Sequence, residues 1–215
     1  MTTVDKIHSA LVNLNISGIA DLTKSAIEQG VPATDILNKG LLPGMKVIGD
    51  RFCNGEIFLP ELILSGRVMK QAMAILRPTF KVREFKNRGK IAIGTVKGDI
   101  HDIGKNLVLM MLEGNGWEVV DLGVDVPAEG FCTFVKENDV DILGMSALLT
   151  TTVPGLKESI DAIKEAGLRD KAKIIVGGAL VTQSIADKYG ADGFASNSVE
   201  AVELANRLLE YKYTY

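Results

Sequence analysis

The sequence predicts an α/β protein built in two parts, a small N-terminal bundle of helices followed by a larger domain with a parallel sheet. Two observations predict it. Residues 4–79 read as helices throughout, whereas from Lys90 onward short apolar runs alternate with helical patterns. Strands that alternate with helices form an open parallel sheet that is covered by helices on both faces.

In the N-terminal part, turn residues divide the helical pattern into four or five short helices. Gly30-Val-Pro32 predicts a break, because Gly tolerates the left-handed conformation after a helix and Pro suits a first helical turn. Gly40 and Pro43 predict another junction. Asn54-Gly55 ends one helix and Leu59-Pro60 opens the next, which carries a broad apolar face.

The segment from Phe80 to Lys90 is predicted to be a linker, since it is charged and shows no sustained periodicity. We therefore expect a helical domain over residues 1–88, with the linker at its end, and a sheet domain over residues 89–215.

Five apolar runs predict the strands of the second domain. They cover residues 91–96, 117–122, 140–145, 173–176 and 192–195, and the helices begin near Asp102, Pro127, Pro154 and Thr182 and after Asn197. The flavodoxin-like (Rossmann-type) strand order 2-1-3-4-5 is the natural choice for five such units. In these sheets ligands bind beyond the carboxyl ends of the strands, where the strand order reverses.

Composition narrows the class of protein. The net charge of −3 offers no electrostatic reason to expect nucleic-acid binding. No apolar run is long enough to span a bilayer and the N-terminus resembles no targeting signal, so we expect no membrane partner and a cytoplasmic location. Cys53 and Cys132 lie far apart and outside any metal-binding spacing, which favours ordinary thiols.

One motif carries chemistry directly. Asp99-x-His101-x-x-Gly104 follows the first apolar run of the sheet domain, so an imidazole stands at a strand exit with a carboxylate two residues away. A metal-ligating imidazole needs such a partner, which accepts the N–H of the second ring nitrogen and fixes the tautomer. Ser146-x-Leu148 and Gly177-Gly178 follow the third and fourth runs, so the three motifs are expected to meet at one edge of the sheet.

These three motifs, in this order, resemble the cobalamin-binding module shared by cobalamin-dependent methionine synthase, the corrinoid proteins of methyltransferase systems and the adenosylcobalamin mutases. Residues 98–106 and 120–127 look like the methyl-transferring branch in particular. The resemblance implies a cobalamin or related corrinoid, with His101 as the cobalt ligand, Asp99 as its acceptor and Ser146 continuing the hydrogen-bonded relay. It also implies cofactor contacts from Asp102, Ile103, Gly104, Leu148, Thr150, Gly177 and Gly178.

The helical domain resembles the cap over the upper face of the corrin in methionine synthase. By position, Phe52, Leu59 and Leu62 would touch that face. An apolar cap would shield reactive cobalt from water and oxygen. The alternative is that these three residues are only core of the bundle.

The function implied by the resemblance is that of a corrinoid methyl carrier, a subunit of a transferase system in one-carbon metabolism. It would accept a methyl group on Co(I) from a donor through a donor-specific methyltransferase. A second methyltransferase would pass the group to an acceptor such as tetrahydrofolate or a thiol coenzyme, and a reductive activase would restore the cobalt. Methanol, methylamines, glycine betaine and aryl methyl ethers are served by proteins of this appearance.

The alternative from another class is a cobalamin-dependent sensor or regulator. That function would normally need an added DNA-binding segment, and the sequence shows no basic recognition helix. A mutase subunit is disfavoured by the helical domain that precedes the motif.

Overall fold

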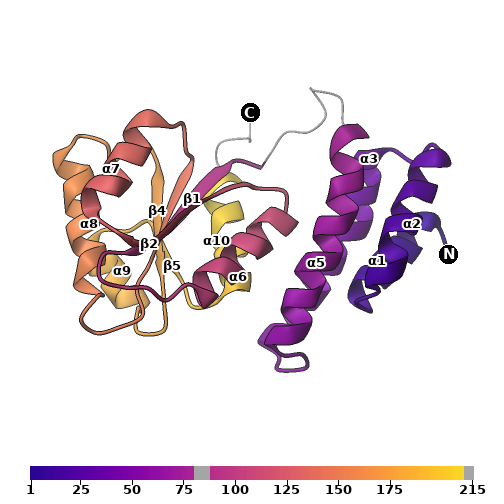
Figure 1. Cartoon of the computed structure of the whole chain (residues 1–215), viewed down its shortest axis with the longest axis horizontal. Helices are drawn as coiled ribbons and strands as arrows, with labels where there is room; N and C mark the ends of the chain where they lie inside the picture. Colours follow the sequence, from indigo (N-terminus) through magenta and orange to yellow (C-terminus); the bar gives the residue numbers. More distant parts are fainter. Residues whose placement is uncertain (80–87, 211–215) are drawn as a thin grey trace. The chain divides into compact units, whose positions relative to one another are not determined.

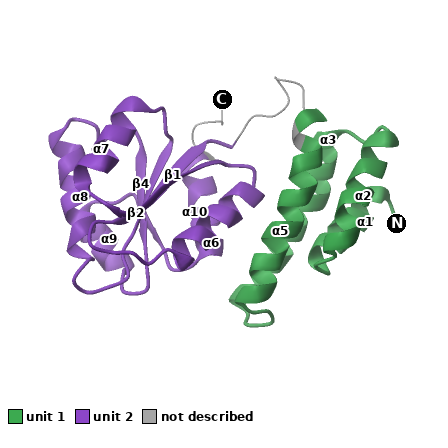
Figure 2. Ribbon diagram, in the orientation of Figure 1, with its two compact units in different colours: residues 1–86 green, residues 87–215 purple. Residues whose placement is uncertain are grey.

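The chain forms two compact units, residues 1–86 and residues 87–215, which Figure 2 shows in green and purple. The computed structural model describes residues 1–79 and 88–210. Most of the expected linker, residues 80–87, therefore lies outside the described residues.

The first unit is helical. Its elements are α1 (Thr3–Val12), α2 (Ile16–Glu28), α3 (Ala33–Asp35), the π-helical turn η1 (Ile36–Leu41), α4 (Leu42–Cys53), α5 (Leu59–Leu76) and the 3₁₀ turn η2 (Arg77–Thr79). α5 packs against α1, α2 and α4, so the longest helix of the unit supplies much of its core. The buried apolar side chains include Ile7, Leu11, Ile19, Leu41, Met45, Ile48, Leu62, Met69 and Leu76.

Most helix boundaries agree with the turn residues, but the junction expected at Gly40 and Pro43 is wrong. The chain stays helical from Ala33 to Cys53, because η1 leads directly into α4. The Leu42 N–H donates to the Leu37 carbonyl, five residues earlier instead of the usual four, so the helix forms a wider π-helical turn here. Pro43 then falls in the first turn of α4, where its missing N–H is tolerated.

The second unit is the predicted α/β domain. Its elements are β1 (Lys90–Val96), α6 (Ile103–Gly114), β2 (Glu118–Val126), α7 (Ala128–Glu137), β3 (Ile142–Ser146), α8 (Pro154–Glu165), β4 (Lys173–Gly177), α9 (Gln183–Tyr189), β5 (Gly193–Ala195) and α10 (Ser198–Glu210). All strand pairs are parallel and their order is β2-β1-β3-β4-β5, which confirms the predicted fold class and strand order. Figure 1 shows α6 and α10 on one face of the sheet and α7, α8 and α9 on the other.

The central strands read as apolar runs because helices cover both of their faces. Every residue of β1 after Lys90 is buried. On the α7–α9 face the strand side chains Ala92, Val96, Leu143, Met145, Ile174 and Val176 meet Phe131, Leu156, Ile160 and Ile163 of the helices. The core therefore fixes where each strand ends, and with it the position of the loops that follow.

Strand β2 lies at the edge of the sheet and is less regular than its neighbours. It runs four residues further than the predicted 117–122, to Val126. Its register with β1 shifts twice, between the pairs Ile93–Asp121 and Gly94–Gly123 and again before Val96–Val126. Each shift places one more residue in β2 than in β1, which is a β-bulge.

Candidate functional site

The three sequence motifs meet at the carboxyl edge of the sheet. Thr95 of β1 pairs with Ser146 of β3, and Ser146 pairs with Gly177 of β4, so these three residues form one row across the sheet. The loop that carries Asp99 and His101 leaves β1 directly beyond this row. The predicted convergence therefore follows from the strand order, since β1 and β3 are neighbours where the order reverses.

Asp99 is the most constrained residue of this edge. Its carboxylate is fully buried and accepts four hydrogen bonds. Oδ1 accepts from His101, through the backbone N–H at 3.0 Å and the ring Nδ1 at 2.7 Å. Oδ2 accepts from the backbone N–H of Leu148 and from the hydroxyl of Thr152, both at 2.7 Å.

The charge state of Asp99 follows from these contacts. Burial alone would raise the pKa of Asp99, but the hydrogen bonds from Leu148, Thr152 and His101 outweigh it and hold that pKa well below its usual range. The side chain is therefore an ionised carboxylate at neutral pH. Such a group can only accept hydrogen bonds, so Nδ1 of His101 carries the proton.

His101 is consequently prepared to act as a ligand through its other nitrogen. Its side chain is 48% exposed, in contrast to Asp99. The hydroxyl of buried Thr95 donates to the His101 carbonyl at 3.1 Å, which fixes the backbone as well as the ring. With Nδ1–H donated to a carboxylate, Nε2 keeps its lone pair, the state in which an imidazole binds a metal.

The third member of the relay is a correction. The hydroxyl that reaches Asp99 belongs to Thr152 and not to Ser146. Thr152 is brought back to Asp99 by the turn after β3, where its Oγ1 also lies 3.1 Å from both the N–H and the carbonyl of Leu149. Ser146 stays in the strand ladder, so its role at the cofactor remains a prediction.

The glycines of the site serve two different purposes. A Cβ on Gly178, at φ +133°, would lie 1.9 Å from the Ala147 carbonyl oxygen, so this position requires glycine for the close approach of two loops. A Cβ on Gly104 would meet nothing within 4 Å, which leaves space on the first turn of α6 for a bulky group. Gly177 forms part of this approach, because its carbonyl accepts from the Ala147 N–H.

Apolar side chains on the loops of this edge point outward. Ile100 and Ile103 are 74% and 72% exposed, and Leu149 and Leu180, on the loops after β3 and β4, are 41% and 45% exposed. Four exposed aliphatic side chains, three on these loops and Ile103 at the start of α6, suit a large, flat and largely apolar ligand. Of these we predicted only Ile103. Asp102 and Thr150 are exposed as well.

The three residues expected on the helical unit differ in accessibility. Leu59, at the start of α5, is 37% exposed, and Phe52 of α4 is half-buried. Leu62 is fully buried. The neighbouring Phe58, which we did not predict, is 68% exposed and lies in the turn between α4 and α5.

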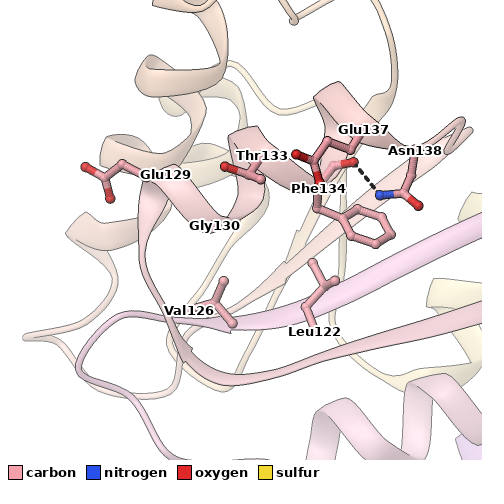
Figure 3. A pocket seen from close by; sticks show the side chains of 8 residues that line it. All are labelled: Leu122, Val126, Glu129, Gly130, Thr133, Phe134, Glu137 and Asn138. Carbon is pink, nitrogen blue, oxygen red and sulfur yellow. Dashed lines mark hydrogen bonds between the residues drawn. The ribbon is translucent and has the colours of Figure 1, made fainter.

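A groove elsewhere on the second unit is lined by none of the three motifs Asp99-x-His101-x-x-Gly104, Ser146-x-Leu148 and Gly177-Gly178. It has a volume of about 430 Å³ and lies between β2 and α7, lined by Leu122, Val126, Glu129, Gly130, Thr133, Phe134, Glu137 and Asn138. Figure 3 shows the side chains of Leu122, Val126 and Phe134 beneath the helix, with Glu129 directed away from them. The predicted site therefore lies outside this groove, at the carboxyl edge of the sheet, where apolar side chains are exposed.

The donor set fits a corrinoid better than a free metal ion. Within residues 1–79 and 88–210, no group of three or more His, Cys, Asp or Glu side chains could hold an ion. A single imidazole suits a metal that already has four ligands in a macrocycle, and the exposed aliphatic loops suit the macrocycle itself. None of the described helices is long and apolar enough to cross a membrane.

Comparisons with known proteins agree with this geometry. Two family models, each described as a B12 binding domain, match residues 89–203 and residues 3–77. The chain is 41% identical to monomethylamine corrinoid protein 1 of Methanosarcina barkeri over 210 aligned residues. The alignment covers 96% of this chain and 97% of that protein.

Two solved structures are similar over most of the chain. A cobalamin-binding protein from Desulfitobacterium hafniense superposes with a TM-score of 0.82 at 35% identity, covering 95% of this chain and 98% of that one. A chain of the methanol:cobalamin methyltransferase complex from Methanosarcina barkeri has a TM-score of 0.83 at 30% identity, covering 97% of this chain and 80% of that one.

Proposed function

Because this chain belongs to the corrinoid proteins of methyltransferase systems, we propose that it is a methyl carrier that alternates between two methyltransferases. Its cofactor is a corrinoid. One enzyme would load a methyl group from a small donor, and the other would unload it to tetrahydrofolate or a thiol coenzyme. The observation that carries the proposal is the His101 ring, held by buried Asp99 at the switch point of the sheet.

His101 would hold the corrinoid through a bond from Nε2 to the cobalt, and the exposed loops after β1, β3 and β4 would contact the macrocycle. When bound, the corrinoid supplies the cobalt that carries the methyl group. The protein's own contribution is a ligand whose proton and orientation are fixed in advance, since Asp99 stays ionised and accepts the Nδ1–H. Thr152 and the Leu148 N–H in turn hold Asp99.

The bond strength of a ligand held in this way can change when a proton moves, with no change in the positions of the residues. The Nδ1 proton lies between a neutral imidazole and a carboxylate that a hydroxyl and two backbone N–H groups stabilise. We propose that the His101–Asp99–Thr152 relay takes up or releases a proton as the ligand bond weakens or strengthens. The strength of the bond from Nε2 to the cobalt would thereby depend on the exchange of a proton with solvent.

We propose that the helical unit shields the corrinoid between transfers, with Phe52 and Leu59 on the shielding surface. The exposure of Leu59 and of neighbouring Phe58 supports this proposal, because large apolar side chains are costly to leave in water. Access of a methyltransferase would then require the shield to move. A reductive activase would act as a third partner after accidental oxidation.

Reconstitution with partner enzymes tests the proposed function. The full chain is loaded with hydroxocobalamin, reduced, and mixed with a candidate donor methyltransferase and monomethylamine, dimethylamine or methanol. We expect a catalytic amount of the chain to support many rounds of transfer to a thiol acceptor, whereas His101→Ala supports few. Failure of every enzyme and donor pair with a fully loaded protein would contradict the carrier function and favour the regulatory alternative.

A further inference from the structure

The second bulge of β2 holds a residue in a backbone conformation that side chains rarely adopt. Asp125 has φ +54°, one of two positive values among the non-glycine residues of the described ranges. It lies where β2 holds one residue more than β1, between the pairs Gly94–Gly123 and Val96–Val126. Strained residues of this kind persist where surrounding contacts determine them, and bulges beside sites redirect side chains.

The bulge directs Asp125 onto the loop that carries His101. Its Oδ1 accepts from the Gly98 N–H at 2.7 Å, and its own N–H donates to the Asp99 carbonyl at 3.0 Å. These two bonds hold the backbone on both sides of the peptide that joins Gly98 to Asp99. The turn is also closed locally, because the Asp99 N–H donates to the Val96 carbonyl at 3.1 Å and Gly98 has φ +79°, so the bonds from Asp125 add a support from β2 to this local one.

We propose that Asp125 is a positioning residue for His101. It acts through a short chain of contacts: its carboxylate fixes the turn at Gly98, the turn fixes the Asp99 main chain, and Asp99 fixes the imidazole. The inference rests on the proposed role of His101 as the cobalt ligand. It adds a further support to the three described above, the Thr95 hydroxyl, the Thr152 hydroxyl and the Leu148 N–H.

The geometry explains why Asp serves at this position. A residue here must tolerate a positive φ and must also present an acceptor to Gly98. Glycine meets the first requirement alone, whereas Asp and Asn meet both, because their short polar side chains make left-handed backbone less costly. Three substitutions of Asp125 and one control at Val124 therefore distinguish the effect of the side chain from that of the backbone.

The test compares Asp125→Gly, which relieves the backbone and removes the acceptor, with Asp125→Asn, which keeps both properties. Val124→Gly is the matched control, since it adds the same backbone freedom to the same bulge and leaves Asp125 in place. Asp125→Ala removes the acceptor as well and provides a second test should the glycine variant fold poorly. Fluorescence of Trp117, buried in the same unit, verifies folding.

The first readout uses the protein without cofactor. Two-bond ¹H–¹⁵N correlations of the His101 ring distinguish the two tautomers and report which nitrogen carries the proton. We expect the Nδ1–H form in wild type, Asp125→Asn and Val124→Gly, and a mixture of both tautomers in Asp125→Gly and Asp125→Ala. Folded Asp125→Gly and Asp125→Ala proteins that keep the wild-type tautomer would overturn the proposal.

The second readout adds hydroxocobalamin. Loss of one hydrogen bond corresponds to an affinity about 2- to 10-fold weaker, so we expect Asp125→Gly to weaken corrinoid binding by this factor and Asp125→Asn to preserve it. Wild-type affinity in the folded Asp125→Gly variant would count against the proposal. The tautomer measurement needs no corrinoid, so a failure of the proposed function leaves it intact.

Discussion

The Nδ1 atom of His101 lies 2.7 Å from Oδ1 of Asp99, and the two groups differ sharply in their surroundings. The carboxylate is fully buried, whereas half of the imidazole side chain is exposed. The charged partner is thus shielded from water while the ring remains accessible to a ligand.

Asp99 should stabilise the second unit in a pH-dependent way. Its pKa is lowered in the folded protein, so its contribution is complete above the ordinary pKa of about 4. Below that value the unfolded chain takes up a proton that the folded protein does not, and the contribution declines. Asp99→Asn should therefore cost about 1–3 kcal/mol at pH 7 and progressively less in acid.

Urea denaturation followed by Trp117 fluorescence measures this difference, since the chain has a single tryptophan and it lies buried in the second unit. A stability difference between wild type and Asp99→Asn that does not change between neutral and acidic pH would contradict the assignment of Asp99 as an ionised acceptor.

The Thr152 hydroxyl should matter more to Asp99 than the Ser146 hydroxyl. Thr152→Val preserves shape but leaves Oδ2 with the Leu148 N–H alone, and should cost about 1–3 kcal/mol because the group is buried. Thr152→Ser keeps the hydroxyl and should cost much less, and Ser146→Ala should leave the apo-protein close to wild type. The same denaturation assay checks all three, and equal losses in Thr152→Val and Ser146→Ala would refute the corrected relay.

Lys105 and Asp121 should respond unequally to substitution. The Lys105 side chain is almost fully buried and pairs with Asp121, whose side chain is half exposed. Asp121→Ala leaves a buried ammonium whose remaining acceptor is Asn106, and should cost about 3 kcal/mol. Lys105→Met leaves a carboxylate that water can reach, so it should cost less. A reversed order of unfolding free energies would argue against a desolvated ammonium.

In the helical unit, substitutions of exposed apolar residues and of a buried core residue should have different effects. Leu59→Ala and Phe58→Ala should change the stability of the unit by less than about 1 kcal/mol yet speed oxidation of the reduced corrinoid in air-equilibrated buffer. Leu62→Ala should cost about 2–5 kcal/mol, since Leu62 is fully buried. Hydrogen exchange over α5 measures stability and absorbance follows oxidation, with Glu56→Ala as the control. Unchanged oxidation in all apolar variants would remove the shield proposal.

The sequence predicts the sheet and the first two members of the site because both depend on local patterns. Apolar runs that alternate with helical segments predict a parallel sheet, for which the order 2-1-3-4-5 is the natural choice, and Asp99 and His101 lie two residues apart in the sequence. Thr152 could not be placed in this way. A strand residue such as Ser146 has a face set by alternation, whereas the loop beyond it returns Thr152 to Asp99 through contacts that no period encodes.

Two other features were beyond the reach of pattern reasoning for similar reasons. A proline often marks a helix boundary, but here a π-helical turn precedes Pro43 and the chain stays helical on both sides of it. The role of Asp125 depends on a register shift between β2 and β1 and on a positive φ, neither of which follows from propensity. Both are decided by tertiary contacts.

Ligation of cobalt by His101 is tested most directly by electron paramagnetic resonance of the Co(II) corrinoid bound to protein labelled with ¹⁵N-histidine. The chain has two histidines, so His8→Gln isolates the signal of His101. The nitrogen superhyperfine splitting should change from triplets to doublets on labelling in wild type and His8→Gln, and should be absent in His101→Ala. A splitting that does not respond to the label, or that persists in His101→Ala, would contradict the assignment of His101 as the ligand.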